Sequence, residues 1–162
     1  MLGVLVARAA GQPFDALLLE RIFEPLGMAD TGFFVPVTDL PRCATGHRRD
    51  QTTGEMVVYD PAVGRSWNSA PRFPSGGGGL VSTGTDLPAF ARALPDGSSG
   101  PVRLLSRPTI EAMTSDQLTP AQKTFSALVP GFFERNGWGF GVSIVTGPDG
   151  RARNVGTYGW DG

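Results

Sequence analysis

Glycine and proline interrupt this chain so often that long regular elements are disfavoured. The 162 residues include 23 glycines and 14 prolines, and both residue types weaken helix interiors and central strands. We therefore expect short elements joined by many turns and by irregular connections. Because 40% of the residues are hydrophobic and 18% are charged, the chain still has enough apolar side chains to fold around a core.

The start of the chain, about residues 1–35, is predicted to be largely helical. Apolar residues at helical spacing indicate one helix that ends at Gly11 and a second that begins at Pro13 and is stopped by Pro25. Residues 2–23 thus form a helical pair. The connection that follows is predicted to be held by apolar anchors, which are Leu26, Met28, Phe33 and Phe34.

Residues 36–75 are predicted to be an irregular insert that contains one hairpin. The hairpin has its turn at Thr53 and Gly54 and a strand over residues 56–59. The rest of this stretch gives no further clear signal.

Two helices and a terminal hairpin are predicted over about residues 76–162. Thr85 is the expected N-cap of the first helix, and Ser106 is the expected N-cap of a shorter one that ends near Thr114. The inward residues of these helices are predicted to be Leu87, Phe90, Ala91, Leu94, Ile110 and Met113. The runs "NGWGFGVSIVT" and "RARNVGTYGW" flank the turn sequence "GPDG" and predict two antiparallel strands.

The charge and the single cysteine remove several function classes. The formal net charge is −1 and there is one lysine, Lys123, so the chain offers no basic stripe and no nucleic-acid partner is expected. Cys43 alone excludes an internal disulfide. The opening run breaks at Arg8 and is interpreted as a helix rather than a signal peptide, and no membrane span is expected. Localisation stays open.

The residues show no catalytic apparatus of their own. There is no G-x-S-x-G elbow, and Ser-x-x-Lys is excluded because Pro120 lies three residues before the only lysine. His47, the only histidine, is interpreted as a loop residue. One histidine and one cysteine without clustered carboxylates give no metal set, and no cofactor is expected.

Two further features have structural and functional interpretations. Gly76–Gly79 lack the Lys-Ser/Thr of a phosphate-binding loop and are interpreted as tight backbone packing before a helix. A group of aromatic residues either lines a site for an apolar ligand or fills the core, and core filling is favoured. These residues are Phe132, Phe133, Trp138, Phe140, Tyr158 and Trp160.

The order of several runs resembles a known family. "LGVLVARAAGQPFDALLLERIFEPLGMADTGF", "FPSGGGGLVSTGTDLPAFARAL", "RLLSRPTIEAMT", "NGWGFGV" and "YGWDG" together cover nearly the whole chain. In this order they resemble serine hydrolases related to class C β-lactamases, penicillin-binding proteins and their esterase relatives. The resemblance implies an α+β fold of the β-lactamase/transpeptidase type, in which a helical part packs on an antiparallel sheet.

The family builds its active site from three motifs, and the resemblance assigns this chain only one. Ser-x-x-Lys carries the nucleophile and Tyr-x-Asn assists proton transfer; neither occurs in this sequence. The third motif, a Lys-Thr-Gly-like or His-x-Gly-like triplet, matches Trp160, Asp161 and Gly162, which are the expected substrate-binding residues. No catalytic residue is assigned.

The resemblance therefore implies a single incomplete domain, 1–162, lying between the second and third motifs of a hydrolase. The parent is expected to act on an ester, an amide or a β-lactam through an acyl-enzyme, and this chain is expected to be inactive by itself. Trp160 replaces a cation that could bind a substrate carboxylate, which favours an ester, amide or peptide substrate over a β-lactam. The alternative is a free-standing, non-catalytic binding module derived from the same fold.

Overall fold

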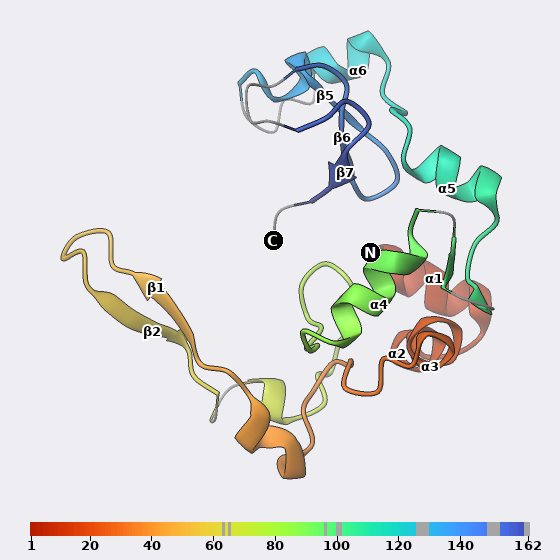
Figure 1. Cartoon of the computed structure of the whole chain (residues 1–162). Coiled ribbons are helices and arrows are strands. Elements are labelled where there is room, and N and C mark those ends of the chain that lie inside the picture. The colour runs from red at the N-terminus through yellow and green to blue at the C-terminus, as the bar shows by residue number, and fades with distance from the viewer. Residues whose placement is uncertain are drawn as a thin grey trace. The chain divides into compact units, whose positions relative to one another are not determined.

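The structure is a computed structural model that describes residues 1–62, 64, 66–95, 97–99, 102–125, 130–148 and 153–160 (Figure 1). Helices and small antiparallel sheets make up both of its compact units, Met1–Phe90 and Ala91–Gly162, and the division falls within α4. The α+β class is confirmed. The expectation of one incomplete domain with an insert over residues 36–75 stays a prediction.

The first unit begins with a short helix whose end was predicted correctly. Helix α1 (Leu2–Ala10) ends at Gly11, which has φ 68° and donates its N–H to the Arg8 carbonyl. Glycine adopts this left-handed conformation without the steric cost of a side chain. All nine residues of α1 are described, and none is buried.

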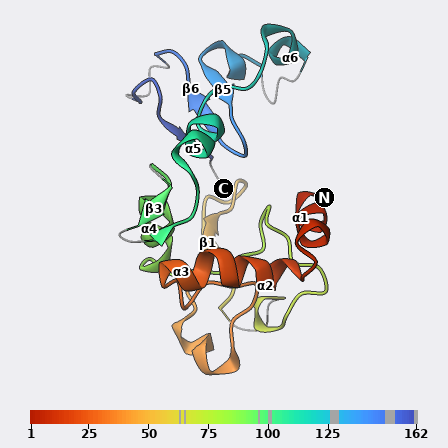
Figure 2. The same cartoon turned by 90° about the vertical axis from the view of Figure 1, so that its right-hand side faces the viewer.

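The second helix continues past Pro25, contrary to the prediction. Helix α2 (Phe14–Leu18) runs into the π-helical turn η1 (Leu19–Phe23) and then into α3 (Glu24–Leu26), and Figure 2 shows them as one rod. The wider π turn accommodates the proline ring, which would otherwise clash with a carbonyl in the preceding turn. Gly27, with φ 68°, ends the segment.

The core of the first unit lies where the chain leaves this rod. Met28 and Phe33 are buried as predicted, whereas Phe34 is 45% exposed. The ring of Phe14 lies 5.9 Å from that of Phe33. A Cβ added to Gly76 would lie 3.2 Å from the Phe14 ring, so this part of the glycine run packs closely as expected. The other buried apolar residues here are Phe23 and Val35.

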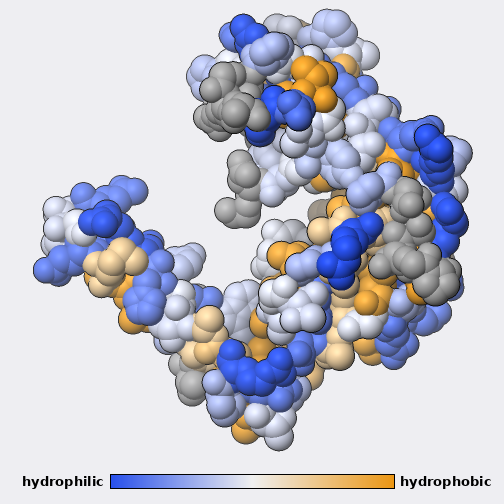
Figure 3. Space-filling model, viewed as in Figure 1, coloured by the Kyte–Doolittle hydropathy of each residue, from blue (hydrophilic) through white to orange (hydrophobic). Residues whose placement is uncertain are grey.

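A hairpin extends from the first unit after the 3-10 turn η2 (Val37–Arg42) (Figure 1). Strand β1 (Gly46–Arg49) pairs antiparallel with β2 (Met56–Asp60), and Gly54 takes φ 74° in the turn, as predicted. His47 therefore lies on a strand and not in a loop. The surface of the β1–β2 hairpin is largely polar, with apolar residues along one side (Figure 3). A second 3-10 turn, η3, spans Ser66–Asn68.

Helix α4 (Asp86–Ala93) has a different cap and a different inward face from those predicted. Thr83, rather than Thr85, accepts the Asp86 N–H on its hydroxyl at 3.1 Å and the Leu87 N–H on its carbonyl. Asp86 is buried and Leu87 is 59% exposed. Helix α4 is rotated in this way because the Asp86 carboxylate is hydrogen-bonded to the segment near residue 30.

The second unit continues with two very short strands and a helix. Strands β3 (Ser98–Ser99) and β4 (Val102–Arg103) pair antiparallel. Helix α5 (Arg107–Met113) is capped by the Ser106 hydroxyl, which accepts the Thr109 N–H, and Ile110 is buried. The cap, the inward Ile110 and the end at Thr114 are all confirmed.

The sheet of the second unit has three strands where two were predicted. After α6 (Pro120–Phe125) and the 3-10 turn η4 (Phe132–Glu134), the order is β5-β6-β7. The run "NGWGFGVSIVT" folds back on itself because Gly141, with φ 85°, permits a turn inside it. The predicted turn "GPDG" lies partly outside the described residues. The strands are β5 (Asn136–Trp138), β6 (Ser143–Val145) and β7 (Tyr158–Gly159).

Candidate functional site

Trp160 is the one predicted substrate-binding residue that the structure describes. It follows β7 directly, and its side chain is 56% exposed. Asp161 and Gly162 lie outside the described residues. The candidate site is therefore built from Trp160 and the sheet that carries it.

The register of the sheet brings Trp160 close to a second tryptophan. Trp138 on β5 pairs with Ser143 on β6, which pairs with Gly159 on β7. Directly opposed residues of antiparallel strands share one face of the sheet. Ser143 has a small side chain and Gly159 has none, so neither residue blocks the contact between the rings of Trp138 and Trp160.

The two indole rings and a phenylalanine form a compact cluster. The ring centroids of Trp138 and Trp160 lie 4.7 Å apart at an interplanar angle of 72°. Phe132 lies 6.3 Å from each of them, and Phe133 lies 5.0 Å from Phe132, edge to face. These distances and tilts are those of favourable aromatic pairs. We call Phe132, Trp138 and Trp160 the aromatic cluster.

A polar network fixes the backbone beneath the aromatic cluster. Asp116 accepts the Trp138 N–H at 3.1 Å and pairs with Lys123. Burial raises the pKa of Asp116, but hydrogen bonds from Lys123 and from two backbone amides outweigh it, so the pKa lies below the ordinary 3.8. The Asn136 amide group donates to the Phe132 carbonyl at 2.9 Å, which ties η4 to β5. The cluster therefore has a rigid support.

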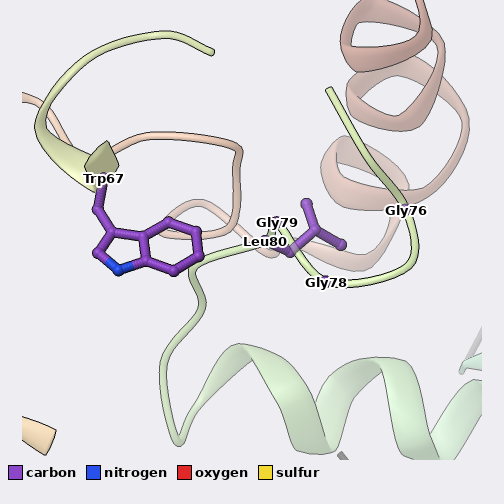
Figure 4. A pocket seen from close by; sticks show the side chains of 5 residues that line it. All are labelled: Trp67, Gly76, Gly78, Gly79 and Leu80. Atoms are coloured by element: carbon purple, nitrogen blue, oxygen red, sulfur yellow. The ribbon is translucent and has the colours of Figure 1, made fainter. Parts of the chain in front are cut away.

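The first unit contains two hollows of its own. The larger, of about 730 Å³, lies between the segment 29–36 and residues 80–84. The smaller, of about 390 Å³, lies beside the glycine run, where Trp67 faces Gly79 and Leu80 (Figure 4). The Trp67 indole N–H donates to the Asp60 carboxylate at 3.1 Å, which holds the ring at the rim of both hollows.

One wall of the larger hollow is held by charged and hydroxyl groups. Asp86 accepts the Asp30 N–H and the Thr31 hydroxyl, each at 2.9 Å. Arg42 binds both carboxylate oxygens of Asp30, at 2.9 and 2.6 Å, and these bonds hold the pKa of Asp30 below its ordinary value. Gly32 and Val81 exchange two backbone hydrogen bonds. The carboxylates of Asp30 and Asp86 and the Thr31 hydroxyl thus each have a partner within this wall.

The remaining candidates for chemistry belong to the first unit. His47 is exposed on β1, and Cys43 is half-buried after η2. Among the described residues no three His, Cys, Asp or Glu side chains are grouped so that they could hold a metal ion.

Within the described residues, no single helix is long and apolar enough to cross a membrane. The helices Leu2–Ala10 and Phe14–Leu26 would be long and apolar enough only together, and they are bent by 78° at the break between them.

Comparison with known proteins identifies the family. A sequence profile described as Beta-lactamase matches residues 1–162. The chain belongs to the β-lactamase family. This β-lactamase-family chain is 36% identical over 169 residues to Protein Rv1367c of Mycobacterium tuberculosis, which covers 100% of the chain and 41% of that relative. It is 28% identical over 164 residues to Penicillin-binding protein 4 of Amycolatopsis lactamdurans, with 100% and 36% covered.

A solved structure agrees with the predicted fold type. EstCE1, described as a hydrolase with promiscuous acyltransferase activity, superimposes with a TM-score of 0.68 at 22% identity, over 96% of this chain and 42% of that one. The chain thus has part of a β-lactamase/transpeptidase-like fold and is related to penicillin-binding proteins, as predicted. It spans about two-fifths of the length of the proteins it matches.

Sequence reasoning placed Trp160 in a site but missed how it is held. The contact of Trp160 with Trp138 joins the residue after β7 to β5, and only the structure reveals it. The sequence hints at this contact only through the small residues Ser143 and Gly159, which lie opposite Trp138 in the sheet. The hollows of the first unit could be anticipated only from the glycine run Gly76–Gly79.

Proposed function

We propose that this chain is part of a serine hydrolase whose complete form cleaves an ester, an amide or a β-lactam through an acyl-enzyme, and that the chain is inactive by itself. The observation that carries the proposal is the absence of Ser-x-x-Lys and Tyr-x-Asn in 162 residues that match the family throughout. A serine without an activating base is a poor nucleophile. The coverage of about two-fifths of each relative supports the same interpretation.

In this proposal the chain supplies a wall of the active site and the start of one of its strands. The complete enzyme's serine attacks a carbonyl carbon, two backbone N–H groups hold the oxyanion, and water later cleaves the acyl-enzyme. Trp160, Asp161 and Gly162 take the place of the third motif. They bind the substrate beside the reacting carbonyl.

The indole at position 160 favours substrates that lack a carboxylate at this point. A lysine or histidine there would supply a cation for such a group, whereas indole supplies only a hydrogen-bond donor and an apolar ring. An ester, amide or peptide substrate is therefore preferred over a β-lactam. The description of EstCE1 as a hydrolase with acyltransferase activity is in keeping with this preference.

The test begins with the DNA that flanks the coding sequence. Translation on the upstream side is expected to give Tyr-x-Asn near Met1 and Ser-x-x-Lys further back, and the extended protein is expected to hydrolyse a small chromogenic ester. Alanine in place of the recovered serine should abolish that activity. A natural transcript that encodes neither motif would overturn the proposal and favour the non-catalytic binding module.

A further inference from the structure

The hairpin of the first unit has a strand edge with no neighbouring strand. Strand β2 (Met56–Asp60) pairs with β1 (Gly46–Arg49), and among the described residues no other strand joins this sheet (Figure 1). A strand edge presents backbone N–H and C=O groups in a row, and these groups can pair with a strand of another chain. The outer edge of β2 is therefore a candidate interaction surface.

The hydrogen bonds of the hairpin show which backbone groups face this edge. Next to the turn, the Asp50 N–H donates to the Glu55 carbonyl at 2.8 Å, so these two residues form a hydrogen-bonded pair. Hydrogen-bonded and non-hydrogen-bonded pairs alternate along an antiparallel ladder. In the register of the hairpin Met56 and Val58 fall in non-hydrogen-bonded pairs, and their N–H and C=O groups therefore point outward.

The outer edge of β2 is apolar and short. Met56 is 59% exposed and Val58 is 57% exposed, and Val57 lies between them. Beyond Val58 the register shifts at a bulge opposite Gly46 and His47, and a bulge bends the strand that carries it. Residues 56–58 are thus the straight part of the edge. They include no charged residue and no proline, which commonly protect exposed edges from pairing.

The sequence of this edge is complementary to a second copy of itself. If Val57 lies opposite Val57 of the second copy, each Met56 lies opposite a Val58, and the outward groups of these residues meet as hydrogen-bonded pairs. All the side chains that then face each other are apolar. The edge of β1 lacks this property, because its Arg48 and Arg49 would lie close to the same arginines of the second copy.

The same register also brings opposite charges together. The Arg48 guanidinium lies over the Tyr59 ring at 5.1 Å, on the face of the sheet that carries Val57, the residue opposite Arg48. The Glu55 side chain belongs to this face as well, since side chains alternate along a strand. Glu55 of one copy lies opposite Tyr59 of the other in this register, so its carboxylate meets the Arg48 guanidinium held over that ring.

We propose that two copies of this chain associate through β2, in antiparallel order about a two-fold axis at Val57, and form a four-stranded sheet with the order β1-β2-β2-β1. This inference does not depend on the proposed function. Because only residues 56–58 of each strand pair, the contact is small and the dimer forms at high protein concentration. Each copy uses its only β2 edge, so the assembly stops at the dimer.

Disulfide crosslinking tests the register of this dimer. Cys43→Ser removes the single native cysteine, and Val57→Cys or Val58→Cys then supplies one thiol. Both proteins also carry Leu2→Gln and Leu5→Gln, which remove exposed apolar side chains of α1. Opposed residues of a non-hydrogen-bonded pair have Cα atoms about 4.5 Å apart, within reach of a disulfide.

Only position 57 lies opposite its own copy in the proposed register. With oxidised glutathione, Val57→Cys is therefore expected to form the disulfide-linked dimer about tenfold faster than Val58→Cys, whose thiols are offset along the strands. Random collision would favour Val58→Cys instead, because Val58 is the more exposed residue. Equal rates, or a faster reaction of Val58→Cys, would overturn the proposal.

Charge reversal tests the contact between Glu55 and Arg48. Glu55→Arg and Arg48→Glu are made separately in the Val57→Cys protein, and each should crosslink roughly threefold to tenfold more slowly because like charges then meet across the axis. An equal mixture of the two variants restores opposite charges, so the mixed dimer, identified by its intact mass, should form at the original rate. A hairpin that is merely weakened within each chain would show no such recovery, and its absence would contradict the proposed pairing.

Sedimentation equilibrium of the Leu2→Gln/Leu5→Gln chain, with its hairpin unchanged, measures the size of the assembly. A monomer–dimer equilibrium is expected. Species that keep growing with concentration would indicate open-ended pairing of β1 with β2 and would contradict a closed dimer.

Discussion

At the scale of single residues, close approach of backbone explains the glycines around Trp138. A Cβ on Gly139 would overlap the Met113 carbonyl oxygen, which accepts the Phe140 N–H at 3.1 Å. A Cβ on Gly137 would overlap the Asp116 carboxylate. Neither Gly137 nor Gly139 has a positive φ. Glycine is therefore needed at these positions because a side chain would not fit, and not because of the backbone conformation. The run "NGWGFG" thus permits α5 and the segment after it to lie against β5.

Replacing Gly139 by alanine is therefore expected to destabilise the second unit. Because the opposing atom belongs to the backbone and cannot rotate away, the loss should be about 1–3 kcal/mol, as for overpacked cores. Urea unfolding followed by tryptophan emission measures it. Gly147→Ala is the control, since nothing lies near that position. An unchanged midpoint for Gly139→Ala would show that this approach is looser than described.

At the scale of elements, single carboxylates join segments that are far apart in the sequence. Asp86 at the start of α4 is 6% exposed and accepts hydrogen bonds from Asp30 and Thr31. Asp116 before α6 holds Lys123 and the backbone of β5. Each carboxylate thereby determines how a helix or strand is placed within its own unit.

Asp86→Ala is expected to lower the free energy of unfolding by about 1–3 kcal/mol, because the Asp30 N–H and the Thr31 hydroxyl lose their buried acceptor. Asp15→Ala, at an exposed position of α2, is the matched control. Thermal unfolding of the two variants compares them. If both lose the same stability, the Asp86 bonds contribute nothing specific.

The lowered pKa of Asp116 predicts an acid sensitivity of the second unit. A folded-state pKa below the ordinary 3.8 means that the stabilisation is fully present above that value and is lost as the pH falls through the folded pKa. The unfolding free energy should therefore drop below about pH 4 more steeply in the native chain than in Asp116→Asn. Parallel pH profiles of the two proteins would contradict this account.

Local signals predicted some element ends but not others, because the end of the second helix and the cap of α4 differ from the prediction. Gly11 and Ser106 act through their own backbone neighbours, so their roles follow from the sequence. The rotation of α4 depends on Asp86 meeting residues more than fifty positions away. The aromatic cluster likewise depends on strand register. The sequence grouped Trp160 with Trp138 and Phe132, but the favoured interpretation, core filling, does not hold for Trp160, which is 56% exposed, and the contacts among the three rings could not be predicted.

At the scale of the whole molecule, helix α1 exposes an apolar face. The chain spans about two-fifths of the length of the relatives compared above. Leu2 is 77% exposed, Leu5 is 60% exposed and Val6 is 43% exposed. A contiguous apolar surface of this kind favours association with another apolar surface. The isolated chain is therefore expected to self-associate.

Polar substitutions on α1 test that expectation. The double variant Leu2→Gln/Leu5→Gln should shift the chain toward monomer in light scattering at rising concentration, because it removes most of the exposed apolar face. Val155→Gln changes an exposed valine elsewhere and should have no effect. Association that persists equally in both variants would mean that α1 is not the contact surface.

The central claim is that this β-lactamase-family chain lacks an activated nucleophile, and intact-protein mass spectrometry tests it most directly. The chain is incubated separately with a fluorophosphonate and with a penicillin, and its mass is compared with that of the untreated protein. Our account predicts no covalent adduct with either reagent, since no serine has a lysine three residues after it. A stoichiometric adduct on one serine would contradict it.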